Sequence, residues 1–320
     1  MSLTTRILVT GGAGFIGSNL AEELIRQGAR VCIIDDLSTG FRENLDEIKG
    51  DFEFIEGDIN DDLSLSKALD RVEVIFHEAA LPSVPRSVED PAETHRVCVD
   101  GTFNLLVKAK EAGAKRFVYA ASSSAYGDQP ILPKTESMRP DPLSPYAVAK
   151  LTGEYYCRAF HNVYGLETIS LRYFNVFGPR QNPGSMYSGV ISRFIDALMR
   201  DGTAEIYGDG EQSRDFTYIS NVVHANIMAA QTTQGLGETM NVANGDRITL
   251  NELFETLKKV TGKTNAAVEY KEARAGDVKH SQADNGRALE CLDYKELVGL
   301  EEGLRRTIDW WRASRFATNA

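Results

Sequence analysis

Short apolar runs alternate with amphipathic segments through the first half of this chain, and this alternation constrains the fold more than any other feature. The amphipathic segments predict helices, such as 15–28, which ends at Gly28, and 101–113, which ends at Gly113. The apolar runs are rich in Val, Ile and Phe, as strands buried on both faces of a parallel sheet are. They are residues 6–10, 30–35, 51–58, 72–80, 116–122 and 167–178. Strand and helix in alternation predict a doubly wound α/β fold.

The second half of the chain has a looser pattern. After residue 178 come loops rich in Gly, Pro and Asn, which predict a second, smaller α/β lobe over the sheet. Residues 238–244 look like one more strand, which we expect to return to the main sheet. Residues 250–262 and 301–315 have the periodicity of amphipathic helices.

A glycine-rich turn follows the first predicted strand and opens the first predicted helix. The sequence VTGGAGFIG places Gly11, Gly14 and Gly17 there. Glycine leaves backbone N–H groups unobstructed for a pyrophosphate, and the third glycine lets helix and strand pack closely. The turn therefore predicts a dinucleotide site of the Rossmann type.

Acidic residues end the second predicted strand. A carboxylate at Asp35-Asp36 can bind the ribose hydroxyls of an adenosine and would repel a 2′-phosphate, so the pattern favours NAD over NADP. We predict an NAD-binding Rossmann-type domain over 1–178, rejoined by segments within 218–245, and a substrate-binding lobe over 179–320.

Charge and composition exclude several classes of partner. The formal net charge is −11 and the chain has no Lys/Arg run, so we expect no nucleic acid or anionic membrane as partner. The four cysteines never form CxxC, the five histidines are scattered, and HEAAL at 77–81 lacks the second histidine of a zinc helix, so we expect no metal. With no apolar stretch of 18 residues and no expected signal peptide, we predict a cytoplasmic protein.

The sequence SPYAVAK places Tyr146 and Lys150 four residues apart, on one face of a predicted helix. A phenol with a pKa of about 10 is a poor base at neutral pH. A neighbouring ammonium and an oxidised nicotinamide favour the phenolate, and lowering its pKa to about 7 requires roughly 4 kcal/mol. The phenolate can then take the proton of a substrate hydroxyl as hydride leaves the same carbon.

These motifs together resemble the extended short-chain dehydrogenase/reductase superfamily: GxxGxxG, GD at 57–58, HEAA at 77–80 and the later YxxxK. The resemblance implies that Asp58 holds the adenine and that the backbone of Ala79-Ala80 lines the cofactor. The cofactor-binding residues that it implies are Gly11, Gly14, Phe15, Ile16, Gly17, Asp35, Asp36, Ser38, Asp58, Ile59, Ala79, Ala80, Tyr146, Lys150 and Tyr173.

Three serines follow the strand predicted over 116–122. In the superfamily the catalytic Ser or Thr stands four positions before the tyrosine of a YG pair, here Tyr126-Gly127, which identifies Ser122 as catalytic with Tyr146 and Lys150. Nucleotide-sugar 4,6-dehydratases carry Asp-Glu at the next two positions, so Ser123-Ser124 argues against dehydration. Uronate decarboxylases have glutamate where Ser124 stands, so decarboxylation is disfavoured as well.

Three later segments, 171–183, 206–221 and 274–284, resemble UDP-sugar 4-epimerases, and bacterial UDP-N-acetylglucosamine 4-epimerases most closely. The resemblance covers almost the whole chain. It implies an isomerase with bound NAD, in galactose metabolism or polysaccharide biosynthesis, in which Asn175 contacts the diphosphate and Tyr207 the uracil. It also implies that Arg214 and Arg274 hold phosphate oxygens and that Asp277 holds the ribose. The implied substrate-binding residues are Ser83, Ser122, Ser123, Tyr146, Asn175, Val190, Tyr207, Arg214, Arg274, Asp277 and Ser281.

The residue that lines the C2 side of the hexose by this resemblance is Ser281. Strict UDP-glucose epimerases of the bacterial type carry a tyrosine there, so a serine leaves room for an N-acetyl group. We expect UDP-GlcNAc and UDP-GalNAc as substrates, with UDP-glucose and UDP-galactose also turned over. The alternatives are a UDP-glucuronate 4-epimerase, which would need an extra cationic contact, and a non-catalytic NAD-binding redox sensor.

Two further expectations come from the resemblance. Many relatives have an asparagine close to the nicotinamide side of the cofactor, at the position where this chain has Cys98. The contact of this residue near the nicotinamide therefore departs from the family pattern. The family arrangement is a homodimer through helices at about 93–112 and 145–164, which we expect here too.

Overall fold

The fold is built on a seven-stranded parallel sheet. The computed structural model describes residues 5–182, 189–272, 278–295 and 298–314. The strand order is β11-β6-β5-β4-β1-β2-β3. The strands are β1 (Arg6–Thr10), β2 (Arg30–Asp35), β3 (Phe52–Glu56), β4 (Val74–His77), β5 (Arg116–Ser122), β6 (Glu167–Tyr173) and β11 (Thr239–Val242). The predicted doubly wound Rossmann-type fold is confirmed, and the order reverses between β1 and β4, where such sheets bind their ligands.

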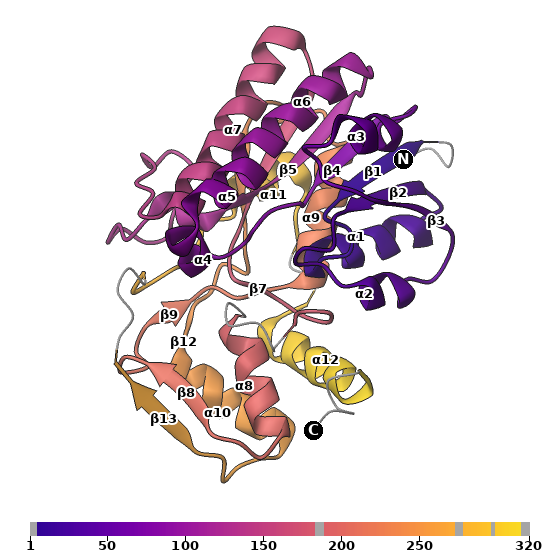
Figure 1. Cartoon of the computed structure of the whole chain (residues 1–320). Helices are drawn as coiled ribbons and strands as arrows, with labels where there is room; N and C mark the ends of the chain where they lie inside the picture. The colour runs from indigo at the N-terminus through magenta and orange to yellow at the C-terminus, as the bar shows by residue number, and fades with distance from the viewer. Residues whose placement is uncertain (1–4, 183–188, 273–277, 296–297, 315–320) are drawn as a thin grey trace.

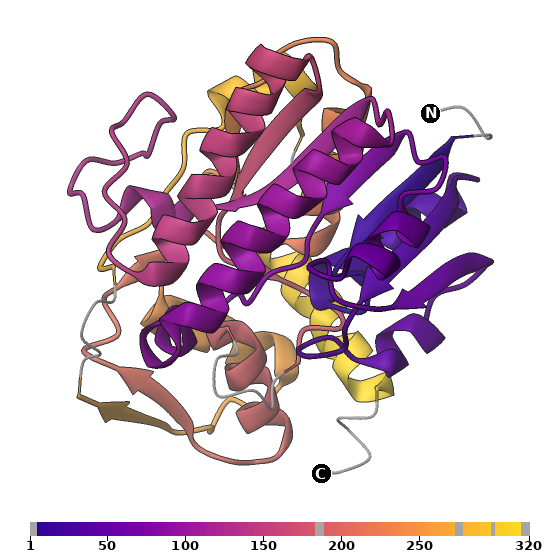
Figure 2. The ribbon, with the colours of Figure 1, turned by 45° about the horizontal axis from the view of Figure 1, so that its top comes forward.

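Helices cover both faces of this sheet because its buried side chains point alternately to either side. Ile7 and Val9 of β1 belong to a core with the helices α1 (Phe15–Arg26) and α9 (Ile219–Gln231). Leu8, between them, belongs to a second core on the opposite face. The helices of that face are α3 (Asp62–Ala68), α6 (Gly101–Glu111) and α7 (Pro145–Tyr164), of which α6 and α7 lie side by side in Figure 2.

Shorter helices lie near the ends of the strands. They are α2 (Arg42–Asp46), α4 (Val84–Glu89), α5 (Pro91–His95), the π-helix η1 (Arg96–Asp100), the 3-10 helix η2 (Ser123–Tyr126) and α11 (Gly286–Leu292). The π-helix directly precedes α6, so the chain is helical from Pro91 through Glu111 rather than from the predicted start at 101.

The strand predicted over 167–178 is interrupted. β6 ends at Tyr173, Asn175 takes a left-handed φ of 34°, and the chain resumes as β7 (Val176–Phe177). β7 leaves the main sheet and pairs with β10 (Thr217–Tyr218). This turn directs the chain into the second lobe.

The second lobe lies below the sheet in Figure 1. β8 (Ala204–Tyr207) pairs in parallel with β13 (Val268–Lys271), and β9 (Ser213–Arg214) pairs antiparallel with β12 (Ile248–Thr249). Its helices are α8 (Val190–Met199), α10 (Leu250–Thr261) and α12 (Leu300–Ala313). The helices predicted over 250–262 and 301–315 are α10 and α12, and α10 starts with a capping box of Thr249 and Glu252.

The strand expected over 238–244 is confirmed as β11, which pairs with β6 in the main sheet. α9 packs on the same sheet, while the division into domains, including the rejoining of segments within 218–245, stays a prediction. All four cysteines are buried free thiols. Across the described ranges, no three His, Cys, Asp or Glu side chains are grouped so that they could hold a metal ion. None of the described helices has the length and apolar character needed to cross a bilayer.

Candidate active site

Two neighbouring cavities lie at the carboxyl end of the sheet. The larger one, of about 690 Å³, runs from the glycine turn after β1 to the ends of β5 and β6. The smaller one, of about 210 Å³, lies in the second lobe. Asn175, Val176, Gln181 and Gly189 line both, so the two cavities adjoin. All fifteen predicted cofactor residues line the larger cavity.

The glycine turn is packed so tightly that a side chain would not fit at two of its positions. Gly11 has a φ of 68°, and a Cβ on it would lie 2.7 Å from the Ala79 Cα atom. A Cβ on Gly17 would lie 2.3 Å from the Gly11 carbonyl oxygen. Gly14 is the N-cap of α1, and no side chain hydrogen-bonds that cap. The first-turn N–H groups of the helix are thus open to an anion, as phosphate binding at a helix N-terminus requires.

The acidic residues of the cofactor cavity are held in place by the backbone and by one arginine. Asp35 accepts hydrogen bonds from the Ala13 N–H at 2.9 Å and the Leu37 N–H at 2.8 Å. Burial raises the pKa of Asp35, while these hydrogen bonds lower it. Asp58 pairs with Arg96 at 2.7 Å, a contact that the sequence did not predict. Contacts within the protein alone therefore fix the orientation of both carboxylates.

A buried hydrogen-bonded chain supports the HEAA backbone. His77 contacts the Thr10 hydroxyl at 2.8 Å and the Thr102 hydroxyl at 2.9 Å. The Thr102 hydroxyl donates to the Cys98 carbonyl, so it accepts from Nε2–H of His77, and Nδ1 accepts from Thr10. Thr10 in turn accepts from the Ala79 N–H. Burial lowers the pKa of His77 to about 3, so the ring stays neutral in this role.

Ser122, Tyr146 and Lys150 come together at one end of the larger cavity. Ser122 ends β5, and Tyr146 lies in the first turn of α7, which starts with Ser144 as N-cap and Pro145 at its first position. Lys150 follows one turn later, so both side chains share a helix face.

The aromatic ring of Tyr119 lies under Lys150. The Lys150 Nζ atom is 4.6 Å from the ring centroid, and the Tyr119 hydroxyl donates to the Lys150 carbonyl oxygen at 3.2 Å. The ring reaches this place because α7 has Gly153 above it, where a Cβ would lie 2.2 Å from the Tyr119 hydroxyl. Strand β5 thereby positions Lys150 as well as Ser122, which ends it.

The protein groups alone do not produce a phenolate. Burial raises the pKa of Tyr146 well above its usual value, and Cys98 and Glu78 raise it further, while a hydrogen bond from Ser122 lowers it. Burial also lowers the pKa of Lys150. The ionised phenol therefore requires a further positive charge, which an oxidised nicotinamide brings to this cavity when it binds.

The serine cluster is arranged around Ser122. The Ser122 Oγ atom accepts hydrogen bonds from the Ser124 N–H at 3.2 Å and the Ser124 hydroxyl at 2.9 Å. These two donors leave the Ser122 hydroxyl hydrogen free to point to Tyr146. Ser123 does not line either cavity in the described part of the chain.

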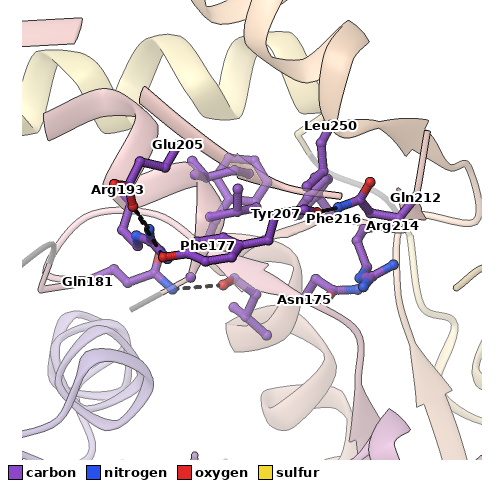
Figure 3. Close-up of a pocket in the computed structure, with 14 residues that line it drawn as sticks. Asn175, Phe177, Gln181, Arg193, Glu205, Tyr207, Gln212, Arg214, Phe216 and Leu250 are labelled. Carbon is purple, nitrogen blue, oxygen red and sulfur yellow. Dashed lines mark hydrogen bonds and ion pairs between the residues drawn. The ribbon is translucent and has the colours of Figure 1, made fainter. Parts of the chain in front are cut away.

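The smaller cavity holds several of the predicted substrate residues (Figure 3). Tyr207, Arg214, Val190 and Asn175 line it. In Figure 3 Tyr207 lies between Arg193 with Glu205 on one side and Arg214 on the other. The pairing of Arg193 with Glu205 was not predicted.

Besides Ser123, three more predicted substrate residues lie elsewhere or cannot be placed. Ser281 is half-buried, and its N–H donates to the Ser213 carbonyl of β9 at 3.0 Å, beside Arg214, but it lines neither cavity. Arg274 and Asp277 lie outside the described residues. Ser83 lines the larger cavity as the N-cap of α4.

Cavity residues that the sequence did not single out include Glu78 and Arg86. Glu78 belongs to the HEAA motif quoted from the sequence. An acidic residue directly after a predicted buried strand was the signal that could have identified it. Cys98, at the position where many relatives have asparagine, is buried in the π-helix and its Sγ atom accepts from the Leu81 N–H at 3.4 Å. Its thiol is thus used to hold the chain that follows the HEAA motif.

Comparison with known proteins agrees with this geometry. Residues 7–243 match the model of the NAD dependent epimerase/dehydratase family. The chain belongs to this family. It is an NAD-dependent enzyme, and the larger cavity is lined by all the residues expected to bind the cofactor.

Individual relatives cover nearly the entire chain. UDP-glucose 4-epimerase of Mycolicibacterium smegmatis is 40% identical over 96% of this chain and 98% of its own. The structure of UDP-N-acetylglucosamine 4-epimerase from Methanobrevibacter ruminantium in complex with UDP-N-acetylmuramic acid is 40% identical, with a TM-score of 0.92 over 97% of this chain and 99% of its own. UDP-glucuronic acid 4-epimerase from Bacillus cereus, in complex with UDP-glucuronic acid and NAD, is 33% identical, with a TM-score of 0.89 over 97% and 99%.

Proposed function

We propose that the protein is a UDP-hexose 4-epimerase that interconverts C4 epimers through a 4-keto intermediate. One observation carries the proposal: Ser122, Tyr146 and Lys150 meet in the NAD cavity, directly beside a second cavity that contains Arg214. The second cavity supplies what a nucleotide diphosphate needs, since the guanidinium of Arg214 suits phosphate oxygens and Tyr207 offers an aromatic face. The relatives named above are epimerases that act at C4 of UDP-sugars.

Each catalytic residue has a distinct task in this proposal. Tyr146 removes the proton from the C4 hydroxyl and later returns it, and Ser122 donates a hydrogen bond that supports the phenolate. Lys150 supplies positive charge beside it. NAD, when bound, accepts the C4 hydride and gives it back to the opposite face of the sugar.

For the sugar itself we propose UDP-GlcNAc and UDP-GalNAc, with UDP-glucose and UDP-galactose as further substrates. The support is Ser281, which the contact with Ser213 places next to the strand of Arg214. By the family resemblance this position lines the C2 side of the hexose, and a serine there would leave room for an N-acetyl group.

Incubation of the purified protein with UDP-GlcNAc, UDP-glucose and UDP-glucuronate, followed by separation of the C4 epimers, tests the substrate class. Ser281→Tyr is expected to lower kcat/KM for the acetylated pair about 5- to 150-fold, because overpacking costs about 1–3 kcal/mol. The plain hexoses should be spared, and Ser281→Ala, which keeps the space open, should leave both pairs near wild type. If Ser281→Tyr lowers both pairs equally, Ser281 is not the gate.

A UDP-glucuronate 4-epimerase is the second candidate, and Arg86 is the observation that favours it. This arginine lines the larger cavity together with Ser83 and could face a uronate carboxylate. If UDP-glucuronate is the fastest substrate and Arg86→Gln selectively raises its KM, this candidate replaces the acetylated sugars.

A further inference from the structure

The carboxylate of Glu78 is held in a fixed position in the active site. The tasks proposed for Ser122, Tyr146 and Lys150 give it no role. Glu78 directly follows β4 and lines the same cavity as Tyr146 and Lys150. The Tyr173 hydroxyl donates to its Oε1 atom at 2.8 Å. The same hydroxyl accepts from Nδ2 of the fully buried Asn226, also at 2.8 Å. This chain of donors from β6 and α9 ends on the carboxylate and fixes its orientation.

Opposing effects act on the pKa of Glu78. Burial raises its pKa to about 7, and the hydrogen bond from Tyr173 and the charge of Lys150 oppose that rise. The titratable groups that face it are Lys150 and Tyr146 from α7 and Tyr173 from β6. One additional cation nearby is enough to hold the carboxyl group in its ionised form at neutral pH.

The 4-epimerase chemistry proposed above brings such a cation to this place, and the inference rests on it. Hydride and proton leave the same C4 carbinol, so the ring that accepts the hydride must lie at the Tyr146 end of the cavity. Glu78 lies close to Lys150 and Tyr146, because Lys150 acts on the pKa of Glu78 and Glu78 acts on the pKa of Tyr146. The oxidised nicotinamide ring is positively charged and the reduced ring is neutral.

We propose that Glu78 is the counter-charge to Lys150 and the oxidised nicotinamide, and that it makes the site prefer NAD+ over NADH. In the first half-reaction the sugar C4 carbinol loses a hydride, with its two electrons, to NAD+ and a proton to Tyr146, which leaves the ketone and NADH. In the second half-reaction the ketone receives both back. A preference for NAD+ favours this return and opposes release of the keto sugar.

An exchange experiment on the NAD-loaded protein measures the preference directly. Wild type, Glu78→Gln and Glu255→Gln are equilibrated with a known mixture of free NAD+ and NADH, and the bound ratio is read after the protein is separated from free nucleotide. Glu255 lies on the surface of α10, paired with Lys258, and is the charge-matched control. Glu78→Gln is expected to lower the NAD+ preference about tenfold, which is about 30 mV for a two-electron couple. Glu255→Gln should match wild type.

A second measurement uses the wild-type protein, so it tests the inference even if Glu78→Gln does not fold. In wild type the NAD+ preference should strengthen from about pH 6 to about pH 8, because the Glu78 carboxyl ionises over that range. Tyr173→Phe, which removes the donor to Glu78, should weaken the preference by less than Glu78→Gln. A wild-type preference independent of pH, or an unchanged preference in Glu78→Gln, would overturn the inference.

The experiment separates this inference from the proposed function because it contains no sugar nucleotide. A protein that shows the Glu78 effect but epimerises no UDP-sugar would contradict the proposed function alone. A protein that epimerises normally while Glu78→Gln leaves the bound ratio unchanged would contradict the inference alone.

Discussion

At the scale of single residues, the site depends on a tyrosine whose ionised form the protein disfavours without its cofactor. Burial, Cys98 and Glu78 raise the pKa of Tyr146, and the Ser122 hydrogen bond lowers it. Because burial is the largest of these effects, we expect Tyr146 to act as the proposed base when a positively charged nicotinamide lies beside it. This couples proton removal to the presence of oxidised cofactor.

Replacement of the phenol tests this arrangement. Tyr146→Phe should fold normally and retain NAD but lose at least about a hundredfold in epimerisation, the low end for removal of a general base. The matched control is Tyr155→Phe, which removes a hydroxyl from an exposed ring on the same helix and should keep full activity. Turnover is measured by separation of the C4 epimers, and near-normal turnover in Tyr146→Phe would refute the assigned base.

The serine cluster allows a second test at this scale. Ser122→Ala removes the donor to Tyr146, whereas Ser124→Ala removes only a donor to Ser122. We expect the first variant to lose more kcat than the second, with KM changed little in either. The opposite order would mean that Ser124 is the catalytic serine.

At the scale of helices and strands, α7 carries the tyrosine and lysine, and a buried ion pair fixes this helix to β6. Arg172 of β6 forms two hydrogen bonds with Glu154 of α7, at 2.9 and 2.7 Å, with both side chains nearly fully buried. The Arg172 guanidinium also lies over the Tyr126 ring. The pair sits one turn beyond Lys150, so it holds the catalytic face of α7 against the sheet.

Glu154→Ala should therefore be strongly destabilising, by about 3–5 kcal/mol, because it leaves the arginine buried without its counter-charge. The free energy of unfolding is measured with urea. Glu255→Ala, which breaks an exposed pair with Lys258, should cost less than about 1 kcal/mol. Similar losses in both variants would show that the buried pair does not anchor α7.

The elements were largely predictable, and the exceptions have physical reasons. The strands of the main sheet and the helices α10 and α12 follow from hydrophobic periodicity, which also predicted the return of β11. Periodicity could not show the π-helix at Arg96–Asp100, since one extra residue in a helical turn leaves no mark on the pattern. It also missed the break at Asn175, because a left-handed residue inside an apolar run depends on the tertiary contacts around it.

The site was predictable where motifs are local and less so where contacts are distant in sequence. The cofactor residues line one cavity as expected. The links from Arg96 to Asp58 and from Tyr173 to Glu78 join residues 38 and 95 positions apart, so only the folded chain shows them.

At the scale of the whole molecule, an apolar surface on α6 and α7 supports the expected homodimer. Phe103 on α6 and Val148, Tyr155 and Val163 on α7 are all at least 40% exposed. These two helices lie next to each other in Figure 2. Exposed apolar side chains on two adjoining helices are the kind of feature that an interaction surface has, so we expect the subunits to meet here.

Two charges on this surface should separate the subunits. We expect wild type to sediment as a dimer and the double variant Val148→Asp with Tyr155→Asp to sediment as a monomer in analytical ultracentrifugation. Leu289→Asp introduces the same charge at an exposed apolar position on α11, away from these helices, and should remain dimeric. A monomeric wild type, or a dimeric double variant, would contradict the arrangement.

In the proposed reaction the C4 hydrogen of a UDP-hexose passes to the bound cofactor and returns from it within the same site. UDP-GlcNAc labelled with deuterium at C4, incubated with the NAD-loaded protein in ordinary water, tests that claim most directly. We expect the C4 epimer to form and its C4 to retain the deuterium, because hydride passes to the bound cofactor and back without exchange with solvent. Formation of the epimer with hydrogen from water at C4, or no C4 epimer from any of the UDP-hexoses, would contradict the proposed reaction.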